Sequence, residues 1–204
     1  MVVEANFQNG LGDFMPFTFE KTELEGVVLI KPKVFGDERG YFMEAFNAFD
    51  FEENGINFSV VQFNESLSKK GVLRGIHYQL EPYAQAKIVR CAEGKIFDVA
   101  VDLRKSSKTF GKWVGFVLSE EEKNMVYIPR GFGHAFLVLS ERAKVQYLVD
   151  NKYMPSHEFG IMWNDKDISI DWQKVFPEIN NLILSEKDKN WPTLKEAIDL
   201  GKVF

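Results

Sequence analysis

Apolar and polar side chains alternate with a period of two over much of this chain, in short runs separated by polar turns. That period is typical of a β-strand with one buried face. Residues 95–104 are the clearest case, with Asp98 and Asp102 on one face and, on the other, Phe97, Val99, Val101 and Leu103. The pattern predicts strands over residues 26–32, 40–46, 58–64, 72–79, 86–93, 95–104, 111–119, 124–129, 133–140 and 144–151.

Helical patterns are sparse by comparison. Residues 47–55 predict one short helix, and residues 192–201 predict another that starts at Pro192 and stops at Gly201. Strands that follow one another without intervening helices do not build parallel βαβ units, so an all-β, antiparallel jelly roll with a few short helices is expected. The turn at Gly94 is expected to close a hairpin between two of its strands.

The chain has 204 residues and a hydrophobic share of 45%, which suffices for one sizeable core. A single domain is therefore expected over residues 15–204. Residues 1–14 are expected to be a flexible leader or tag, because Met15 offers an alternative start.

Charge and cysteine content narrow the function classes. The net charge is −5 with no long basic run, so partners such as nucleic acid or an anionic membrane are not expected. No apolar run approaches the roughly 20 residues that cross a bilayer, and the first residues lack the pattern of a signal peptide. The single cysteine, Cys91, excludes an intrachain disulfide and fits a reducing compartment, so a cytoplasmic location is expected.

One predicted strand, "GVLRGIHYQ" over residues 71–79, contains an arginine and a histidine. In a regular strand Arg74 and His77, three positions apart, point to opposite faces. Gly75 lies between them, and a glycine inside a strand often marks a bulge. A bulge there predicts that both side chains face one cavity.

Three further polar side chains share a face with apolar neighbours in predicted strands. They are Lys87, His134 and Tyr147. Each alone fits an ordinary strand end or a core position, but together they indicate a ligand site at the mouth of a barrel. A metal is not expected there, because the position after His77 reads Tyr78-Gln79 where a jelly-roll metal site has a second histidine.

A series of motifs between about Leu24 and Asn190 resembles the dTDP-4-dehydrorhamnose 3,5-epimerase family. The motifs are "GDERGYFMEAF", "VQFNES", "GVLRGIHYQ", "AQAKIVRCAEGKIFDVAVDLR", "TFGKWVG", "IPRGFGHAFLVLSE", "GIMWND" and "LSEKD". The resemblance implies a cupin-type jelly roll, a homodimer and no metal or other cofactor. It also implies a dTDP-4-keto-6-deoxyhexose as substrate and a role in dTDP-L-rhamnose biosynthesis.

The resemblance also implies roles for individual residues. His77 matches the general base, Asp188 the carboxylate that orients it, Tyr147 the acid on the opposite face, and Lys87 the group that steadies the enolate oxygen. Contacts to the nucleotide sugar are implied for Arg39, Glu44, Gln62, Asn64, Arg74, His134, Tyr153, Glu158 and Lys187.

The chain departs from the family pattern at a few positions. Phe63 replaces an acid that is expected to touch the substrate, and Leu148 and Lys152 replace more polar residues around Tyr147. Three alternatives stay open from the sequence: an epimerase of one carbon or a ketoisomerase on the same scaffold, a metal-dependent cupin, and a cupin that only binds sugar.

Overall fold

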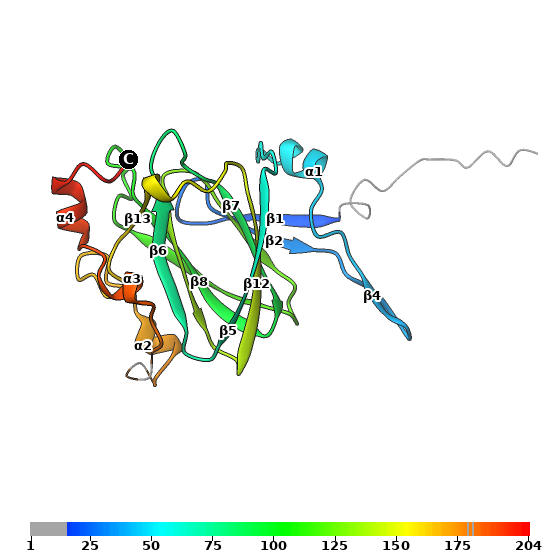
Figure 1. The fold of residues 1–204 in the computed structure, drawn as a ribbon. Helices are drawn as coiled ribbons and strands as arrows, with labels where there is room; N and C mark the ends of the chain where they lie inside the picture. The colour runs from blue at the N-terminus through cyan, green and yellow to red at the C-terminus, as the bar shows by residue number, and fades with distance from the viewer. Residues whose placement is uncertain (1–15, 179, 181) are drawn as a thin grey trace, which may run out of the picture.

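Two antiparallel β-sheets face each other in the computed structural model, which describes residues 16–178, 180 and 182–204 (Figure 1). The six-stranded sheet has the order β1 (Phe17–Lys21), β2 (Val28–Pro32), β10 (Met125–Ile128), β7 (Lys87–Glu93), β12 (Arg142–Val149), β5 (Gln62–Lys69). The five-stranded sheet has the order β13 (Glu158–Gly160), β6 (Leu73–Gln79), β11 (Phe132–Val138), β8 (Lys95–Asp102), β9 (Trp113–Ser119). The expected leader over residues 1–14 lies outside the described residues.

Consecutive strands mostly alternate between the two sheets, as they do in a jelly roll. The predicted all-β, antiparallel class is confirmed. The predicted hairpin around Gly94 is wrong, because β7 and β8 belong to different sheets and Gly94 lies where the chain crosses between them. Its φ of +77° and the carbonyl oxygen of Arg142, which would lie 2.1 Å from an added Cβ, explain the glycine at this position.

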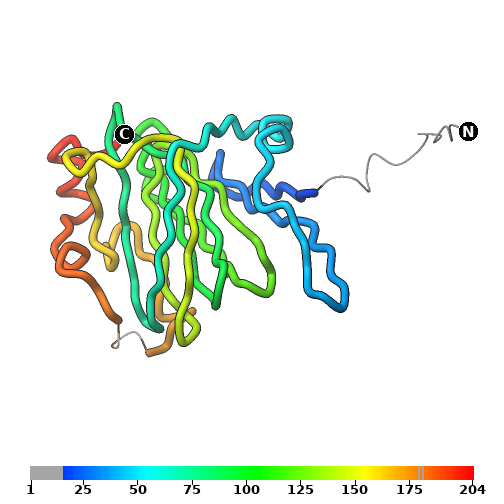
Figure 2. The backbone as a smooth tube through the Cα atoms, turned by 45° about the vertical axis from the view of Figure 1, so that its right-hand side comes forward, coloured from blue at the N-terminus to red at the C-terminus, as the bar shows by residue number. Residues whose placement is uncertain are grey.

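Most predicted strands lie close to their expected positions, and the differences have local causes. β5 begins at Gln62, four residues later than expected, and β4 (Gly40–Phe42) covers only the start of the predicted 40–46. β1, β13 and β3 (Phe35–Asp37) were not predicted, since β3 and β13 are too short to show a period. β3 and β4 pair into a hairpin that projects away from the two sheets in both views (Figures 1 and 2).

Both predicted helices are present, as α1 (Ala48–Glu53) and α4 (Leu194–Asp199). α4 begins with a capping box between Thr193 and Glu196, which satisfies backbone N–H groups of its first turn. The short helices α2 (Trp172–Val175), α3 (Glu186–Lys189) and η1 (Pro155–His157) were not predicted, because one turn is too short to show helical periodicity.

Apolar side chains pack in three layers around the sheets. One cluster fills the space between them and includes Val89, Ile96, Phe136 and Val145. A second covers the outer face of the five-stranded sheet with side chains from the C-terminal segment, and a third packs α1 against the six-stranded sheet. The space between the sheets is therefore left for the side chains that face each other across the interior.

Candidate active site

A cavity of about 750 Å³ opens between the sheets, where polar side chains replace the apolar filling. Its walls come from β5, β6, β7, β11 and β12, and from residues 183–188. Eleven side chains expected at the site line this one cavity: Gln62, Asn64, Arg74, His77, Lys87, His134, Tyr147, Tyr153, Glu158, Lys187 and Asp188.

The bulge predicted at Gly75 is present and has the predicted effect. His134 pairs with His77 and Phe136 with Arg74, so two steps along β11 match three along β6. Gly75 has a φ of +116°, and an added Cβ would lie 2.6 Å from Cα of Ala135. The extra residue turns both Arg74 and His77 into the cavity, as expected.

His77 is tied to a carboxylate that follows it by 111 positions in the chain. Nε2 of His77 contacts Oδ1 of Asp188, while Oδ2 of Asp188 accepts a hydrogen bond from the Ser185 hydroxyl at 2.7 Å. Although burial raises the pKa of Asp188, its bonds to His77, Ser185 and the Gly75 amide hold that pKa below the ordinary value. An ionised Asp188 therefore faces one ring nitrogen of His77.

Ser185 was missed in the sequence, although its spacing to Asp188 is a capping signal. Its hydroxyl accepts a hydrogen bond from the Asp188 amide at 3.1 Å and so caps α3. The same hydroxyl donates to the Asp188 side chain, so one serine fixes both the turn and its carboxylate.

A second histidine–carboxylate pair lies deeper in the cavity. Nε2 of His134 lies 2.8 Å from Oδ2 of Asp98, and both residues are buried. Burial lowers the pKa of His134, although Asp98 opposes the shift. Asp98 was not predicted as a site residue. The sequence did place it on the polar face of its strand, and in the structure that polar face points into the space between the sheets.

Lys87 points from β7 into the same space. Burial lowers the pKa of its ammonium group to about 8, against the opposing attraction of Asp98 and Glu158. Its neighbours on the same face, Val89 and Cys91, lie in the core between the sheets, which confirms the predicted face.

Tyr147 and Arg74 occupy neighbouring parts of the cavity wall. Burial raises the pKa of the Tyr147 phenol above its ordinary value, with Arg74 opposing, so the hydroxyl keeps its proton at neutral pH. The Arg74 guanidinium bonds the hydroxyl of Ser68 at 3.0 Å rather than a carboxylate. Its positive charge is thus available to an anionic ligand.

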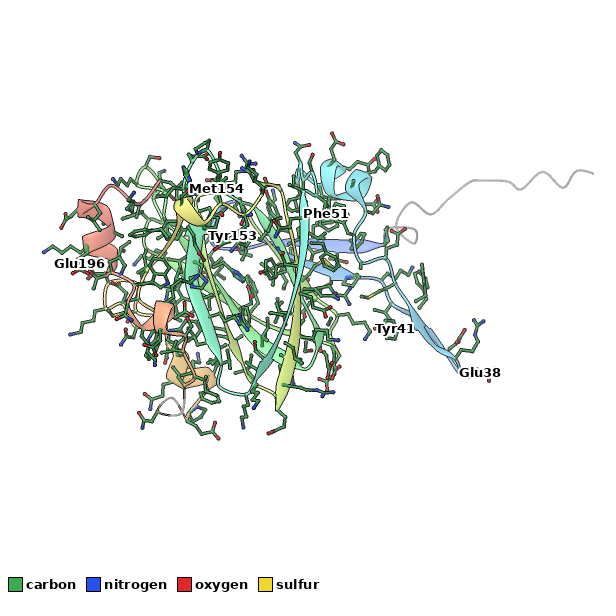
Figure 3. All side chains as sticks on the ribbon, viewed as in Figure 1. Glu38, Tyr41, Phe51, Tyr153, Met154 and Glu196 are labelled. Atoms are coloured by element: carbon green, nitrogen blue, oxygen red, sulfur yellow. The ribbon has the colours of Figure 1, made fainter. Side chains whose placement is uncertain are left out.

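The mouth of the cavity is closed on one side by three linked side chains. Glu158 accepts a hydrogen bond from the Tyr153 hydroxyl and pairs with Nζ of Lys187, each at 2.7 Å. The bond to Glu158 raises the pKa of Tyr153 to about 12. Figure 3 shows Tyr153 beside Met154 above the strands. Buried Gln79 was missed; its side chain bonds the Met154 amide at 2.6 Å and holds this loop in place.

Arg39 and Glu44 do not line the cavity of the chain that carries them. Arg39 is paired with Asp37 near the tip of the β3–β4 hairpin, and its side chain is 85% exposed. Glu44 accepts a hydrogen bond from Asn47 at 3.3 Å. Figure 3 shows Glu38, next to Arg39 in the chain, at the far end of the same hairpin.

Phe63, which was expected to stand in for a substrate-contacting acid, faces away from the cavity. Its neighbours Gln62 and Asn64 line the cavity, while Phe63 is 60% exposed on the other face of β5. It pairs across the strands with Leu148, the other main departure from the family pattern. The two substitutions therefore change one outer surface rather than the site.

Two negative findings hold for residues 16–178, 180 and 182–204. No three His, Cys, Asp or Glu side chains of these ranges come together as metal ligands would. None of the helices in them has the length and apolar character needed to cross a membrane.

The family model described as dTDP-4-dehydrorhamnose 3,5-epimerase matches residues 21–196. The chain belongs to the dTDP-4-dehydrorhamnose 3,5-epimerase family. It is therefore an isomerase, as the motifs implied. A dTDP-4-dehydrorhamnose 3,5-epimerase of Shigella flexneri is 56% identical over 178 residues, which cover 87% of this chain and 96% of the relative.

Solved structures of related epimerases share the fold. A dTDP-6-deoxy-D-glucose-3,5-epimerase from Legionella pneumophila, in complex with dTDP-4-keto-L-rhamnose, has a TM-score of 0.85 at 42% identity. The aligned region covers 92% of this chain and 97% of the Legionella chain. A 3'-monoepimerase from Streptomyces bikiniensis, in complex with dTDP-quinovose, has a TM-score of 0.83 at 37% identity and covers 89% and 90%. The expected cupin-type jelly roll is confirmed.

Proposed function

We propose that this epimerase inverts C3 and C5 of dTDP-4-dehydro-6-deoxy-D-glucose without a cofactor, to give dTDP-4-dehydro-L-rhamnose for dTDP-L-rhamnose biosynthesis. The observation that carries the proposal is the convergence of a paired histidine, a buried lysine and a protonated tyrosine on one cavity. The Legionella relative, bound to a dTDP-4-keto sugar, supports the substrate class.

His77 acts as the general base. Its Nε2 contacts the ionised Asp188, which leaves Nδ1 as the nitrogen that takes the proton from the carbon next to the C4 ketone. The electron pair of the broken C–H bond moves into the C3–C4 or C4–C5 bond, and the ketone oxygen becomes an enolate oxygen. Asp188 stabilises the imidazolium that forms.

Lys87 stabilises the enolate oxygen. A cation held in a cavity that excludes most water stabilises a developing negative charge more strongly than water does. Burial brings the pKa of Lys87 to about 8, so the ammonium form still dominates at neutral pH. His134, fixed by Asp98, lies beside it as a contact for the sugar.

Tyr147 returns a proton to the carbon from the opposite side. It lies on β12 of the six-stranded sheet, while His77 lies on β6 of the facing sheet, so the substrate is held between them. Reprotonation from the face opposite the base inverts the carbon instead of restoring it. The phenolate that remains takes a proton from water, and the His77 imidazolium gives its proton to water, so both groups return to their starting states.

The cavity mouth binds the nucleotide diphosphate. Arg74 and Lys187 supply positive charge, and arginine forks match phosphate oxygens. Gln62, Asn64, Tyr153 and Glu158 provide polar and aromatic contacts around them.

The active form is a homodimer in which the β3–β4 hairpin of one chain reaches the site of its partner. Two site residues expected from the motifs, Arg39 and Glu44, lie outside the cavity of their own chain. The hairpin carries Phe35, Tyr41 and Phe42, which are 52–66% exposed in the single chain. A cytoplasmic location agrees with the single cysteine, Cys91, which is free and buried.

Proton exchange tests the proposed reaction. The protein is incubated with dTDP-4-keto-6-deoxy-D-glucose in deuterated water, and both carbons are followed by NMR. Deuterium at C3 and C5, with formation of the L-rhamno product, is expected. His77→Ala is expected to abolish exchange, and an alanine variant that keeps full turnover contradicts the assignment of the base.

A second candidate is inversion of a single carbon. It is favoured by the Streptomyces bikiniensis 3'-monoepimerase, which has the same fold at 37% identity. Deuterium at C3 alone, with no label at C5 at long times, would establish this alternative.

A further inference from the structure

We propose that Trp191 is a positioning residue that holds the His77 imidazole in place, in addition to the contact with Asp188. The inference rests on the proposed role of His77 as the base. Trp191 lies outside the motifs that indicate the family, and it is not among the side chains that line the active-site cavity. Its effect on the reaction therefore has to pass through another residue.

The indole and the imidazole are in edge contact. Their ring centroids lie 6.1 Å apart with an interplanar angle of 69°. The indole also contacts Phe159 on β13, at 5.5 Å between centroids, and Nζ of Lys187 lies 5.9 Å from its ring centroid. Aromatic pairs at such distances restrict each other's orientation, so Trp191 is held by Phe159 and in turn limits the rotation of His77.

A glycine makes room for this contact. Gly160 on β13 pairs directly with His77 on β6, and residues paired in this way point to the same face of the sheet. An added Cβ at Gly160 would lie 2.5 Å from the Trp191 ring. Gly160 carries no left-handed φ, so the space for the indole is what requires glycine here.

The same short segment delivers both groups that hold the base. Asp188 lies in α3, and Trp191 follows three residues later, just after the C-cap Asn190. The indole N–H is buried and has no hydrogen-bond partner among the described residues, so the ring acts through packing rather than through its polar atom. Asp188 sets the direction of Nε2, and Trp191 sets the plane of the ring.

Four variants test the proposal by steady-state kinetics and thermal unfolding. Trp191→Ala is expected to lower kcat by about 10- to 100-fold and to change KM by much less, because the base is misplaced while, among the substrate-binding side chains, only Lys187 loses a contact. Trp191→Phe is expected to keep most of kcat. Gly160→Ala is expected to resemble Trp191→Ala, since the new methyl group displaces the indole.

The double variant Trp191→Ala/Gly160→Ala separates a local effect from a general loss of stability. If both single changes act through the same contact, the double variant is expected to be no slower than Trp191→Ala alone. Gly115→Ala is the matched control: its Cβ would lie 2.3 Å from the Phe97 ring, a comparable clash remote from His77. It is expected to lower the unfolding temperature and leave kcat unchanged.

Several results would overturn the proposal. They are a Trp191→Ala enzyme with kcat within twofold of the parent, a change confined to KM, additive effects in the double variant, or a Gly115→Ala control that loses as much kcat as Gly160→Ala. If Trp191→Ala does not fold, Gly160→Ala and Trp191→Phe decide. A parent protein without turnover would instead contradict the proposed function, so the two failures are distinguishable.

Discussion

At the scale of single residues, the site gives His77, Tyr147 and Lys87 three different electrostatic environments. His77 is paired with a buried, ionised carboxylate, while Tyr147 on the facing sheet keeps its proton because burial raises its pKa. Lys87 points into the cavity, and burial lowers the pKa of its ammonium group to about 8, close to physiological pH. In the proposed mechanism, these three environments suit His77 to the task of the base, Tyr147 to that of the acid and Lys87 to that of the cation.

Tyr147→Phe is expected to separate proton removal from inversion. The ring still fills its place between the sheets, so His77 continues to exchange the carbon-bound proton with solvent. Without the phenol, protons return only from the side of the base, and the L-rhamno product falls by at least about 100-fold. NMR in deuterated water measures both the exchange of the carbon-bound proton and the formation of product. Deuterium is expected in the recovered starting sugar.

Tyr127→Phe is the control for this change, because Tyr127 is also half-buried but packs in the outer layer against α1. It is expected to leave inversion unchanged. Loss of exchange and inversion to the same extent in Tyr147→Phe would contradict the division of tasks.

The pH dependence should report Lys87. Its pKa is lowered to about 8, so the ammonium form that steadies the enolate is present below that pH and is lost as the pH rises through it. We expect kcat to fall above about pH 8 in the parent, while Tyr147, whose pKa is raised, stays protonated over that range. Lys87→Met is expected to lower kcat by about 100-fold or more and to remove this limb.

Lys187→Gln serves as the comparison in the same pH series. Lys187 is exposed at the mouth and paired with Glu158, so its loss is expected to raise KM and leave the alkaline limb in place. An unchanged limb in Lys87→Met would show that another group titrates there.

At the scale of elements, the bulge in β6 is the feature that converts a strand into part of a site. Without it, Arg74 and His77 would emerge on opposite faces of the five-stranded sheet. The sequence predicted the bulge from the glycine at its centre, and it also predicted that Arg74 and His77 share one cavity. α3 was not, because one helical turn carries no period, although Ser185 and Asp188 have the spacing of an N-cap.

Gly75→Ala is expected to cost stability as well as activity. The position combines a φ of +116° with a Cβ that would lie 2.5 Å from the His134 carbonyl oxygen, and we expect a loss of about 3 kcal/mol or more in the free energy of unfolding. Gly55→Ala is the matched control, since Gly55 has a φ of +82° and open space around its Cβ. It should cost about 1 kcal/mol.

Urea unfolding measures both variants. Equal losses at the two positions would mean that backbone conformation alone, and not contact with β11, requires glycine in the bulge.

At the scale of the whole molecule, the cavity of one chain holds the proposed base, acid and cation but lacks two expected contacts for the nucleotide. Both lie on or beside a hairpin that extends away from the two sheets (Figure 1). An extended hairpin with exposed aromatic side chains gains stability when it packs against a second copy. The proposed dimer thus explains the hairpin and the displaced contacts together.

Mixing two inactive variants tests the dimer. We expect Arg39→Ala and His77→Ala each to lower activity as pure proteins. In a mixed dimer, one site would combine an intact His77 with the partner's intact hairpin, so re-annealing equal amounts should restore about a quarter of the parent activity. Sedimentation measures the dimer itself, and a mixture no more active than its parts would place Arg39 in its own chain's site, or in none.

The sequence by itself determined the strand pattern, the jelly-roll class and the inward face of Lys87, His134 and Tyr147. These follow from a period of two, which is a property of neighbouring residues along one strand. The motifs added the family and the residues expected at the site.

The motifs implied the pairing of Asp188 with His77, and the structure shows that contact across 111 positions. Only the tertiary structure decided the other placements: it put Asp98 behind His134, turned Phe63 outward, and left Arg39 away from the cavity. The physical reason is that such contacts depend on how two sheets close on each other and where the chain crosses between them. Local periodicity carries no information on either.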